Sequence, residues 1–478
     1  MDCPAAIRAA TEAKLIMTSH LFKLELRLLA RERAAWVLLA LFAAALGYGL
    51  WNGGRVAGRQ REAAAAIALD TEVFQTQLRQ HLGQQTLDPK AIAGRGTMAV
   101  LPPAPLPLLA TGQSDLSPGH ESVVLWKLAA PADTRSELEN PSHLLAGRFD
   151  LAFVLVWLYP LFLLALVYDL MAGDRESGTL RLALSQGITP WRWLARRALA
   201  RSLPMLTLAA LATLAAGFFG GPGGVGLRLM LALAVVLAYG LFWVALAIAV
   251  NAVARSAASA ATSLGAAWVL LVLVAPTLLN VTVETLYPTP SRPELVAAGR
   301  KASGEAEKRG GELLNSFYRD HPELAPPGQQ ADFAAQHLTV QTEVGRAVEP
   351  VRQKFDEQLA QQQTAVGRWR FVSPAIAAHE ALTDLAGTGY WRHRAFREQV
   401  NAFKQAVADF YSPKIHRREV LTMADYERLP RFQFREDPAH AWTGRAVTGL
   451  AGMLALAGAL GVWAWRSVRP ARLGLLSN

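Results

Sequence analysis

Six apolar stretches dominate this chain, and each is long enough to cross a lipid bilayer as a helix. A transmembrane helix needs about 20 mostly apolar residues. The stretches cover residues 34–51, 149–170, 199–220, 227–251, 258–282 and 444–465. Runs of this length do not fit the short core helices of a soluble enzyme. The sequence therefore predicts an all-α membrane protein with six transmembrane helices.

Basic residues near the span ends set the expected orientation, because cytoplasmic loops carry an excess of Lys and Arg. Four clusters fall on one side of the membrane if the chain crosses six times. They are Lys14, Lys23, Arg27, Arg31 and Arg33; Arg175, Arg181, Arg192, Arg196 and Arg197; Arg255; and Arg466, Arg469 and Arg472. We expect that side to be the cytoplasm, with both termini inside.

This orientation divides the chain into membrane, cytoplasmic and extracytoplasmic parts, with two large insertions outside. The expected order is an interfacial amphipathic helix at 1–33, the first span at 34–51, extracytoplasmic domain 1 at 52–148, the second span at 149–170, a cytoplasmic loop at 171–198, spans three to five at 199–282, extracytoplasmic domain 2 at 283–443, the sixth span at 444–465, and a cytoplasmic tail at 466–478. The first span reads as a retained anchor. Met17 is an alternative start of the chain, since the amphipathic pattern begins there.

The net charge of +10 has an ordinary explanation in a membrane protein. Basic residues on the cytoplasmic side bind anionic lipid, and the external domains are basic as well. No basic stripe is interleaved with aromatic residues on a soluble module, so we expect no nucleic-acid partner. Cys3 is the single cysteine, which excludes an intrachain disulfide.

The first insertion combines a predicted helix with a proline-rich stretch. Residues 56–82 are rich in Ala, Glu and Gln, with apolar residues at helical spacing. Residues 101–109 read Leu-Pro-Pro-Ala-Pro-Leu-Pro-Leu-Leu, which predicts a stiff extended strut packed on the domain. A ligand for a proline-recognition module is the alternative.

The second insertion is predicted to be a helical hairpin. One stripe of a long polar helix carries Val344, Val348, Val351 and Phe355 at three- and four-residue steps. We expect this stripe to pack on an earlier helix near residues 313–318, with a turn at 321–328. A dimerising coiled coil is the alternative. A further amphipathic helix is expected at 392–420.

Catalytic and metal-binding patterns are weak in this sequence. His379-Glu380 resembles the start of a zinc-protease helix, but Thr383 stands where the second His is needed. No Gly-x-x-x-x-Gly-Lys-Ser/Thr motif is present, so the chain lacks that means of binding a nucleotide. We therefore predict no catalytic residue, no metal site and no cofactor in this chain.

The loop between spans two and three carries the most distinctive short motif. Residues 174–190 read Asp-Arg-Glu-Ser-Gly-Thr-Leu-Arg-Leu-Ala-Leu-Ser-Gln-Gly-Ile-Thr-Pro. Gly178 and Thr179 have the chemistry to end one helix and cap the next. Leu180, Leu182 and Leu184 form an apolar set. A short rigid helix of this kind transmits motion between two proteins better than a flexible loop.

This run resembles the cytosolic coupling loop of type-2 ABC transporter permeases, the type V exporter-like transmembrane subunits. The matching positions are Asp174, Arg175, Glu176, Gly178, Thr179, Leu180, Arg181, Leu184, Ser185 and Thr189. Asp174 replaces the family's usual Glu, and Gln186-Gly187 stands where a proline is common. Residues 99–106, 112–116 and 139–150 in the first insertion, with 373–375, 384–388 and Phe396 in the second, resemble a bacterial subgroup with large insertions after spans one and five.

The resemblance implies a permease subunit of an ABC transporter, an exporter, in the bacterial inner membrane. Its partners would be a separate ATP-binding subunit holding ATP and Mg, a second permease chain (the same chain or a paralogue), membrane lipid, and a periplasmic protein. Two rivals stay open: a membrane-anchored sensory or structural protein, and an ion-driven transporter. The latter requires ionisable residues at mid-membrane, which the spans lack.

Overall fold

The computed structural model describes residues 22–115, 119–128, 149–185, 189–220, 226–288, 292–326 and 332–468. Within these residues, six helices are long and apolar enough to cross a membrane. They are Arg33–Gln84, Leu151–Glu176, Pro190–Gly220, Gly226–Val253, Ala257–Leu286 and Ala439–Ser467. The prediction of a helical membrane protein with six long apolar helices is confirmed.

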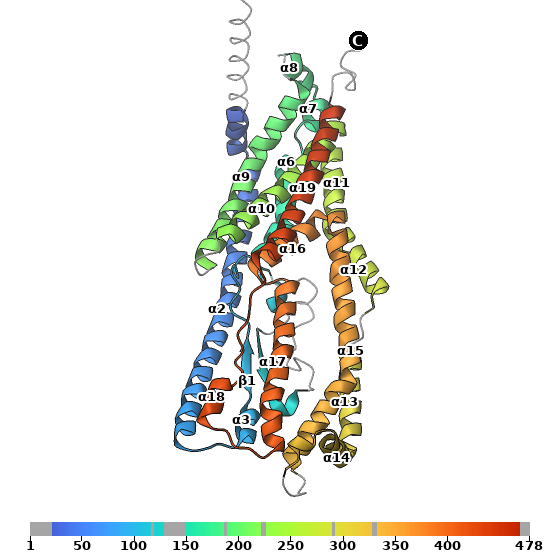
Figure 1. Ribbon diagram of the computed structural model, residues 1–478. Coiled ribbons are helices and arrows are strands. Elements are labelled where there is room, and N and C mark those ends of the chain that lie inside the picture. Colours follow the sequence, from blue (N-terminus) through green and yellow to red (C-terminus); the bar gives the residue numbers. More distant parts are fainter. Residues whose placement is uncertain are drawn as a thin grey trace, which may run out of the picture.

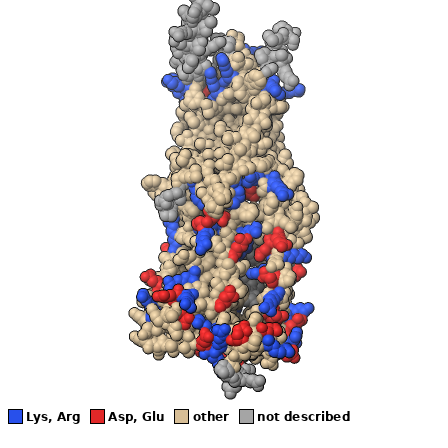
Figure 2. Space-filling view, viewed as in Figure 1, with Lys and Arg blue, Asp and Glu red and all other residues tan. Residues whose placement is uncertain are grey.

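The molecule is elongated, with the apolar helices at one end and mainly polar helices at the other (Figure 1). Figure 2 shows Lys, Arg, Asp and Glu gathered at the upper end and over the lower half, with an almost charge-free band between them. Such a band is what the hydrocarbon core of a bilayer, about 30 Å thick, requires of a protein surface.

Helix α2 (Arg33–Gln84) runs unbroken for 52 residues, about 78 Å at 1.5 Å per residue. The predicted boundary between residues 51 and 52 therefore lies inside a continuous helix that leaves the apolar bundle (Figure 1). A separate helix over 22–31 precedes α2. Glu32 separates the two with extended backbone. The rest of the predicted interfacial helix, residues 1–21, lies outside the described residues.

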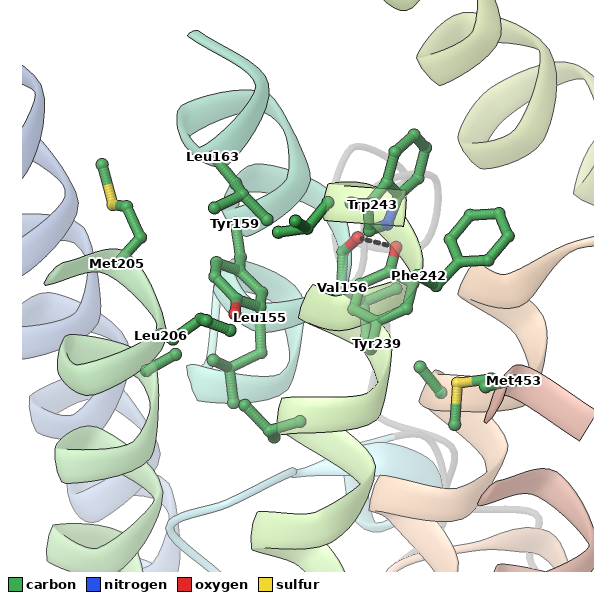
Figure 3. Close-up of a cluster of buried hydrophobic side chains, with 14 of the residues drawn as sticks. Leu155, Val156, Tyr159, Leu163, Met205, Leu206, Tyr239, Phe242, Trp243 and Met453 are labelled. Carbon is green, nitrogen blue, oxygen red and sulfur yellow. Dashed lines mark hydrogen bonds between the residues drawn. The ribbon is translucent and has the colours of Figure 1, made fainter. Parts of the chain in front are cut away.

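The bundle core forms around α10 (Gly226–Val253), which packs against α6 (Tyr159–Val167), α9 (Pro190–Gly220) and α19 (Ala439–Ser467). Figure 3 shows the large side chains that meet there, with Tyr159 from α6 and Tyr239 and Trp243 from α10. All three are almost completely buried. The Tyr239 hydroxyl donates to the carbonyl of Val156 at 2.8 Å.

Two spans contain a π-helical turn. One, η3 (Val154–Leu158), lies between α5 (Leu151–Phe153) and α6; the other, η4 (Val269–Val274), lies between α11 (Ala257–Trp268) and α12 (Ala275–Leu286). Side chains from other elements satisfy carbonyls in these turns. Tyr239 bonds Val156, the Trp268 indole bonds Trp157 at 3.3 Å, and the Ser373 hydroxyl bonds Leu271 at 2.5 Å. These bonds make each irregular turn tolerable in lipid.

The first insertion is not purely helical. After α3 (Pro89–Arg95), the strands β1 (Thr97–Val100) and β2 (His120–Val123) pair antiparallel, with Thr97 opposite Val123. The sequence predicts an all-α membrane protein with mainly helical insertions, and it gives no sign of this small sheet. Short 3-10 turns lie at Gly112–Asp115 and Leu125–Lys127. In the proline-rich stretch, residues 101–104 belong to no helix or strand and residues 105–109 bend and turn, with Leu106 and Leu109 buried.

The second insertion begins with a helical hairpin, as the sequence predicts. Helices α13 (Arg292–Lys308) and α14 (Gly310–Asp320) pack against α15 (Phe333–Trp369). A 3-10 turn at Pro322–Leu324 lies in the predicted reversal.

The helices after the hairpin return to the bundle. A 3-10 turn, η6 (Arg370–Val372), leads into α16 (Pro374–Ala386), which is mostly buried against α10 and α19. The residues predicted as extracytoplasmic domain 2 therefore include a helix embedded in the end of the bundle. Helix α17 (Tyr390–His416) buries Phe396, Val400, Phe403 and Val407 on one face, and α18 (Met423–Arg428) follows. Helix α18 lies beside the far end of α2 (Figure 1), and α17 packs against α3.

Candidate functional site

The segment that carries the distinctive motif lies at the end of the bundle remote from the hairpin (Figure 1). It folds as two short helices, α7 (Ala172–Glu176) and α8 (Thr179–Ser185). Gly178 joins them with φ +78°, a conformation that a residue without Cβ adopts readily. The expected end of the first helix at Gly178 is thus observed. Thr179 differs from expectation, because its hydroxyl bonds back to the carbonyl of Asp174 at 3.3 Å.

Asp174 ties the segment to α9. Its carboxylate pairs with the Arg197 guanidinium and accepts a hydrogen bond from the Trp193 indole at 3.3 Å. Arg197 also donates to the carbonyl of Leu170 at 3.1 Å and pairs with Glu25 on the helix over 22–31 at 3.3 Å. One guanidinium therefore joins the N-terminal helix, the end of span two and the α7 segment.

Arg175 and Glu176 hold the ends of two further helices. The Arg175 guanidinium donates to the carbonyls of Ala254 and Ala252, the latter at 3.2 Å, where α10 ends. The Glu176 carboxylate accepts from the backbone N–H of Ala257 at 3.2 Å, where α11 begins. A cation at a helix C-terminus and an anion at a helix N-terminus are the favourable placements for the helix dipole. Both charges therefore brace the segment.

Asn251 is a key residue of this site that the sequence analysis missed. It is fully buried on α10, and its Oδ1 accepts from the backbone N–H groups of Leu170, Met171 and Ala172 at 3.0–3.4 Å. Its amide donates to the carbonyls of Tyr168 and Ala247 at 3.0 Å. The signal available was a lone amide in an apolar run two residues before the span ends.

The remaining motif residues divide into buried and exposed sides. Leu180 is buried in the bundle core, and Leu184 packs against it. Leu182 is 69% exposed, and Arg181 and Ser185 are exposed beside it on α8. Thr189 is exposed just before α9, and residues 186–188 lie outside the described residues. The predicted apolar set of three leucines is therefore split, and only Leu182 projects outward.

The predicted stripe on α15 is also divided. Val344 and Val348 are buried with Val340 against Ala306, with Leu295, Ala302 and Leu313 packed around them. Val351 and Phe355 are only partly buried. Most of the opposing residues belong to α13. Phe317 and Tyr318, expected to face α15, contact His416 of α17 instead, with ring centroids 4.6 and 5.6 Å away.

A second polar cluster lies where α16 meets the ends of α10 and α19. The Arg445 side chain pairs with Asp384 at 2.5 Å, and Arg228 donates to the carbonyls of Asp384 and Leu385 at 3.2 Å. Burial raises the pKa of Glu380 to about 7, opposed by Arg370 3.9 Å away. Among the described residues, no group of three His, Cys, Asp or Glu side chains is arranged to hold a metal ion.

Part of the chain is similar to a known family model. A family model described as "Domain of unknown function (DUF3526)" matches residues 292–435, less than a third of the chain. The match begins where α13 begins and ends shortly before α19, so it covers the hairpin and α16–α18. No curated protein and no solved structure matches the chain.

Proposed function

We propose that this chain is the transmembrane permease subunit of an ATP-driven transporter, an exporter, and that α8 docks on a separate ATP-binding subunit. The chain itself is not an enzyme in this proposal, since ATP and Mg bind the partner. A second permease chain completes the path through the membrane. The α8 end faces the cytoplasm of a bacterial inner membrane, and the two insertions face outward.

One observation carries the proposal: three of the motif's four charged residues bond other parts of this chain, while an apolar residue of the same segment stays exposed. Arg175 and Glu176 bond the ends of α10 and α11, and Asp174 pairs with a guanidinium of α9. Leu182 projects from the same short segment with 69% of its surface exposed. A braced segment with an outward apolar residue suits a docking element, because force applied to α8 reaches α9, α10 and α11 through the contacts of α7.

Docking is tested by copurification and ATPase activity of the chain with a candidate ATP-binding subunit, such as the product of a neighbouring gene. Leu182→Asp places a charge at the contact and should reduce retention of the ATPase at least tenfold. Leu69→Asp is the matched control, because Leu69 is 62% exposed on α2 near the opposite end of the molecule. Equal retention by wild type and both variants would support the sensory or structural alternative.

Orientation is tested by cysteine labelling in a chain whose Cys3 is replaced by Ser. Gln361 on α15 and Ser185 on α8 are both exposed and lie on opposite sides of the apolar bundle. A membrane-impermeant maleimide should label Gln361→Cys in intact spheroplasts and label Ser185→Cys only after lysis. The reverse pattern would place α8 outside, where no ATPase could reach it.

A further inference from the structure

A groove opens on the side of the bundle near α8, between α10, α11 and α19. Its volume is about 680 Å³. Leu246 and Val250 of α10 and Leu460 of α19 form an apolar wall. Arg255, in the turn between α10 and α11, lies at the end of the groove with Ser259 and Ser263 of α11.

The polar end of the groove is able to hold an anion. Arg255 is exposed, and in the part of the chain that the structure describes it forms no ion pair. The groove-lining residues include no carboxylate. Ser259 uses its hydroxyl to cap α11 by bonding Ser256, whereas the described residues provide no hydrogen bond to the Ser263 hydroxyl. The guanidinium and one hydroxyl are thus available to an outside ligand.

One end of the groove is polar and the other is apolar, which matches the polar headgroup and the apolar acyl chains of a phospholipid. Leu246 and Leu460 lie about two helical turns, roughly 10 Å, from the ends of their helices, deeper in the charge-free band than Arg255. Trp463, half exposed beside them, belongs to a residue type enriched at the membrane–water interface. A lone cation favours a lipid with net negative charge, because a zwitterionic headgroup brings a cation of its own.

We propose that this groove is a binding site for one anionic phospholipid of the leaflet at the α8 end. Its phosphate would contact Arg255 and Ser263, and an acyl chain would lie along Leu246, Val250 and Leu460. In the same turn, the carbonyl of Ala254 accepts a hydrogen bond from Arg175 of α7. The bound lipid would therefore contact the turn that holds α7 in place. Binding itself is independent of the proposed transport function.

Native mass spectrometry of the purified full chain tests the site. The protein is reconstituted with equal amounts of phosphatidylglycerol and phosphatidylcholine of identical acyl chains, and the lipids retained are counted. Wild type should retain phosphatidylglycerol at least threefold more than phosphatidylcholine. Arg255→Gln should abolish this preference, and Arg255→Lys should keep most of it. Val250→Phe, which fills the groove, should reduce retention of both lipids.

The matched control is Arg181→Gln, which removes an exposed arginine at the same end of the molecule outside the groove. It should leave the preference unchanged. The proposal is overturned if Arg255→Gln retains the wild-type preference, or if Arg181→Gln loses it equally. It is also overturned if Val250→Phe separates a dimer without altering lipid retention, because the groove would then be a contact between two copies of the chain.

Discussion

The α7–α8 segment and the α13–α15 hairpin achieve order by opposite means. Polar contacts hold the segment, through Arg197, Asn251 and the ends of α10 and α11. Small apolar side chains hold the hairpin, with Ala306 against Val340, Val344 and Val348. The hairpin thus buries most of its apolar stripe within the molecule, whereas the α7–α8 segment leaves Leu182 exposed. An exposed apolar residue therefore points more strongly to a protein partner when polar contacts hold its helix in place, because that residue is not needed for the fold.

The largest effect that tests this contrast is expected at Asn251. Asn251→Ala removes the acceptor of three buried backbone N–H groups. Because an unsatisfied buried donor costs about 1–3 kcal/mol, we expect a loss of about 3–5 kcal/mol in stability. Thermal unfolding of the purified protein measures it. Asn280→Ala is the matched control, since Asn280 is exposed in an apolar helix and should change stability by less than about 0.5 kcal/mol. Equal effects would show that the segment does not depend on its polar anchor.

A titratable contact beside the hairpin should give the next largest effect. Burial lowers the pKa of His416 to about 4, and the ring stacks on Phe317. His416 therefore binds a proton near pH 6.5 in the unfolded chain, but only near pH 4 in the folded chain. Stability is fully present above pH 6.5 and falls as the pH falls through this window, by roughly 3 kcal/mol.

His416→Gln should flatten that part of the pH profile, as followed by hydrogen exchange of α14 and α17. His393, whose pKa burial also lowers to about 4, should supply the slope that remains. His120→Gln, on the exposed side of β2, is the control and should leave the profile unchanged. An unaltered slope in His416→Gln would mean that this contact does not hold α14 in place.

The apolar side of the comparison is tested at Val344. Val344→Ala removes two buried methyl groups, which should cost about 1.5–2 kcal/mol at about 0.8 kcal/mol per carbon. Phe355→Ala should cost less per carbon removed, because Phe355 is only partly buried. Hydrogen exchange along α13 and α15 measures both. A larger loss per carbon at Phe355 would mean that this residue is covered by another chain.

The sequence predicted those parts of the structure that depend on periodicity and length. The six apolar helices follow from long runs of apolar residues, and the α13–α15 hairpin follows from an apolar stripe at helical spacing. The small β1–β2 sheet was missed because four-residue strands give too short a pattern. The continuity of α2 was missed because residues 52–84 are polar enough to read as a new domain, although nothing in them ends a helix.

The motif located the segment but not the direction of its side chains. Asp174, Arg175 and Glu176 read as surface charges for a partner, and the structure directs each of them to a neighbouring helix of the same chain. Their partners Arg197, Ala254 and Ala257 come from parts of the chain that a local pattern does not connect. Asn251 was missed for the same reason, since four of its five side-chain hydrogen bonds depend on the packing of span four against span two.

Docking of α8 on an ATP-binding subunit is tested most directly by site-specific photocross-linking. Leu182 is replaced by p-benzoylphenylalanine, the chain is expressed with the candidate ATPase, and cross-linked bands are identified by mass spectrometry. The same replacement at Leu69 is the control. We predict that position 182 cross-links to the ATP-binding subunit and that position 69 does not. Failure of position 182 to reach the ATPase, in a complex where the two proteins copurify, would contradict the assignment of α8 as the coupling element.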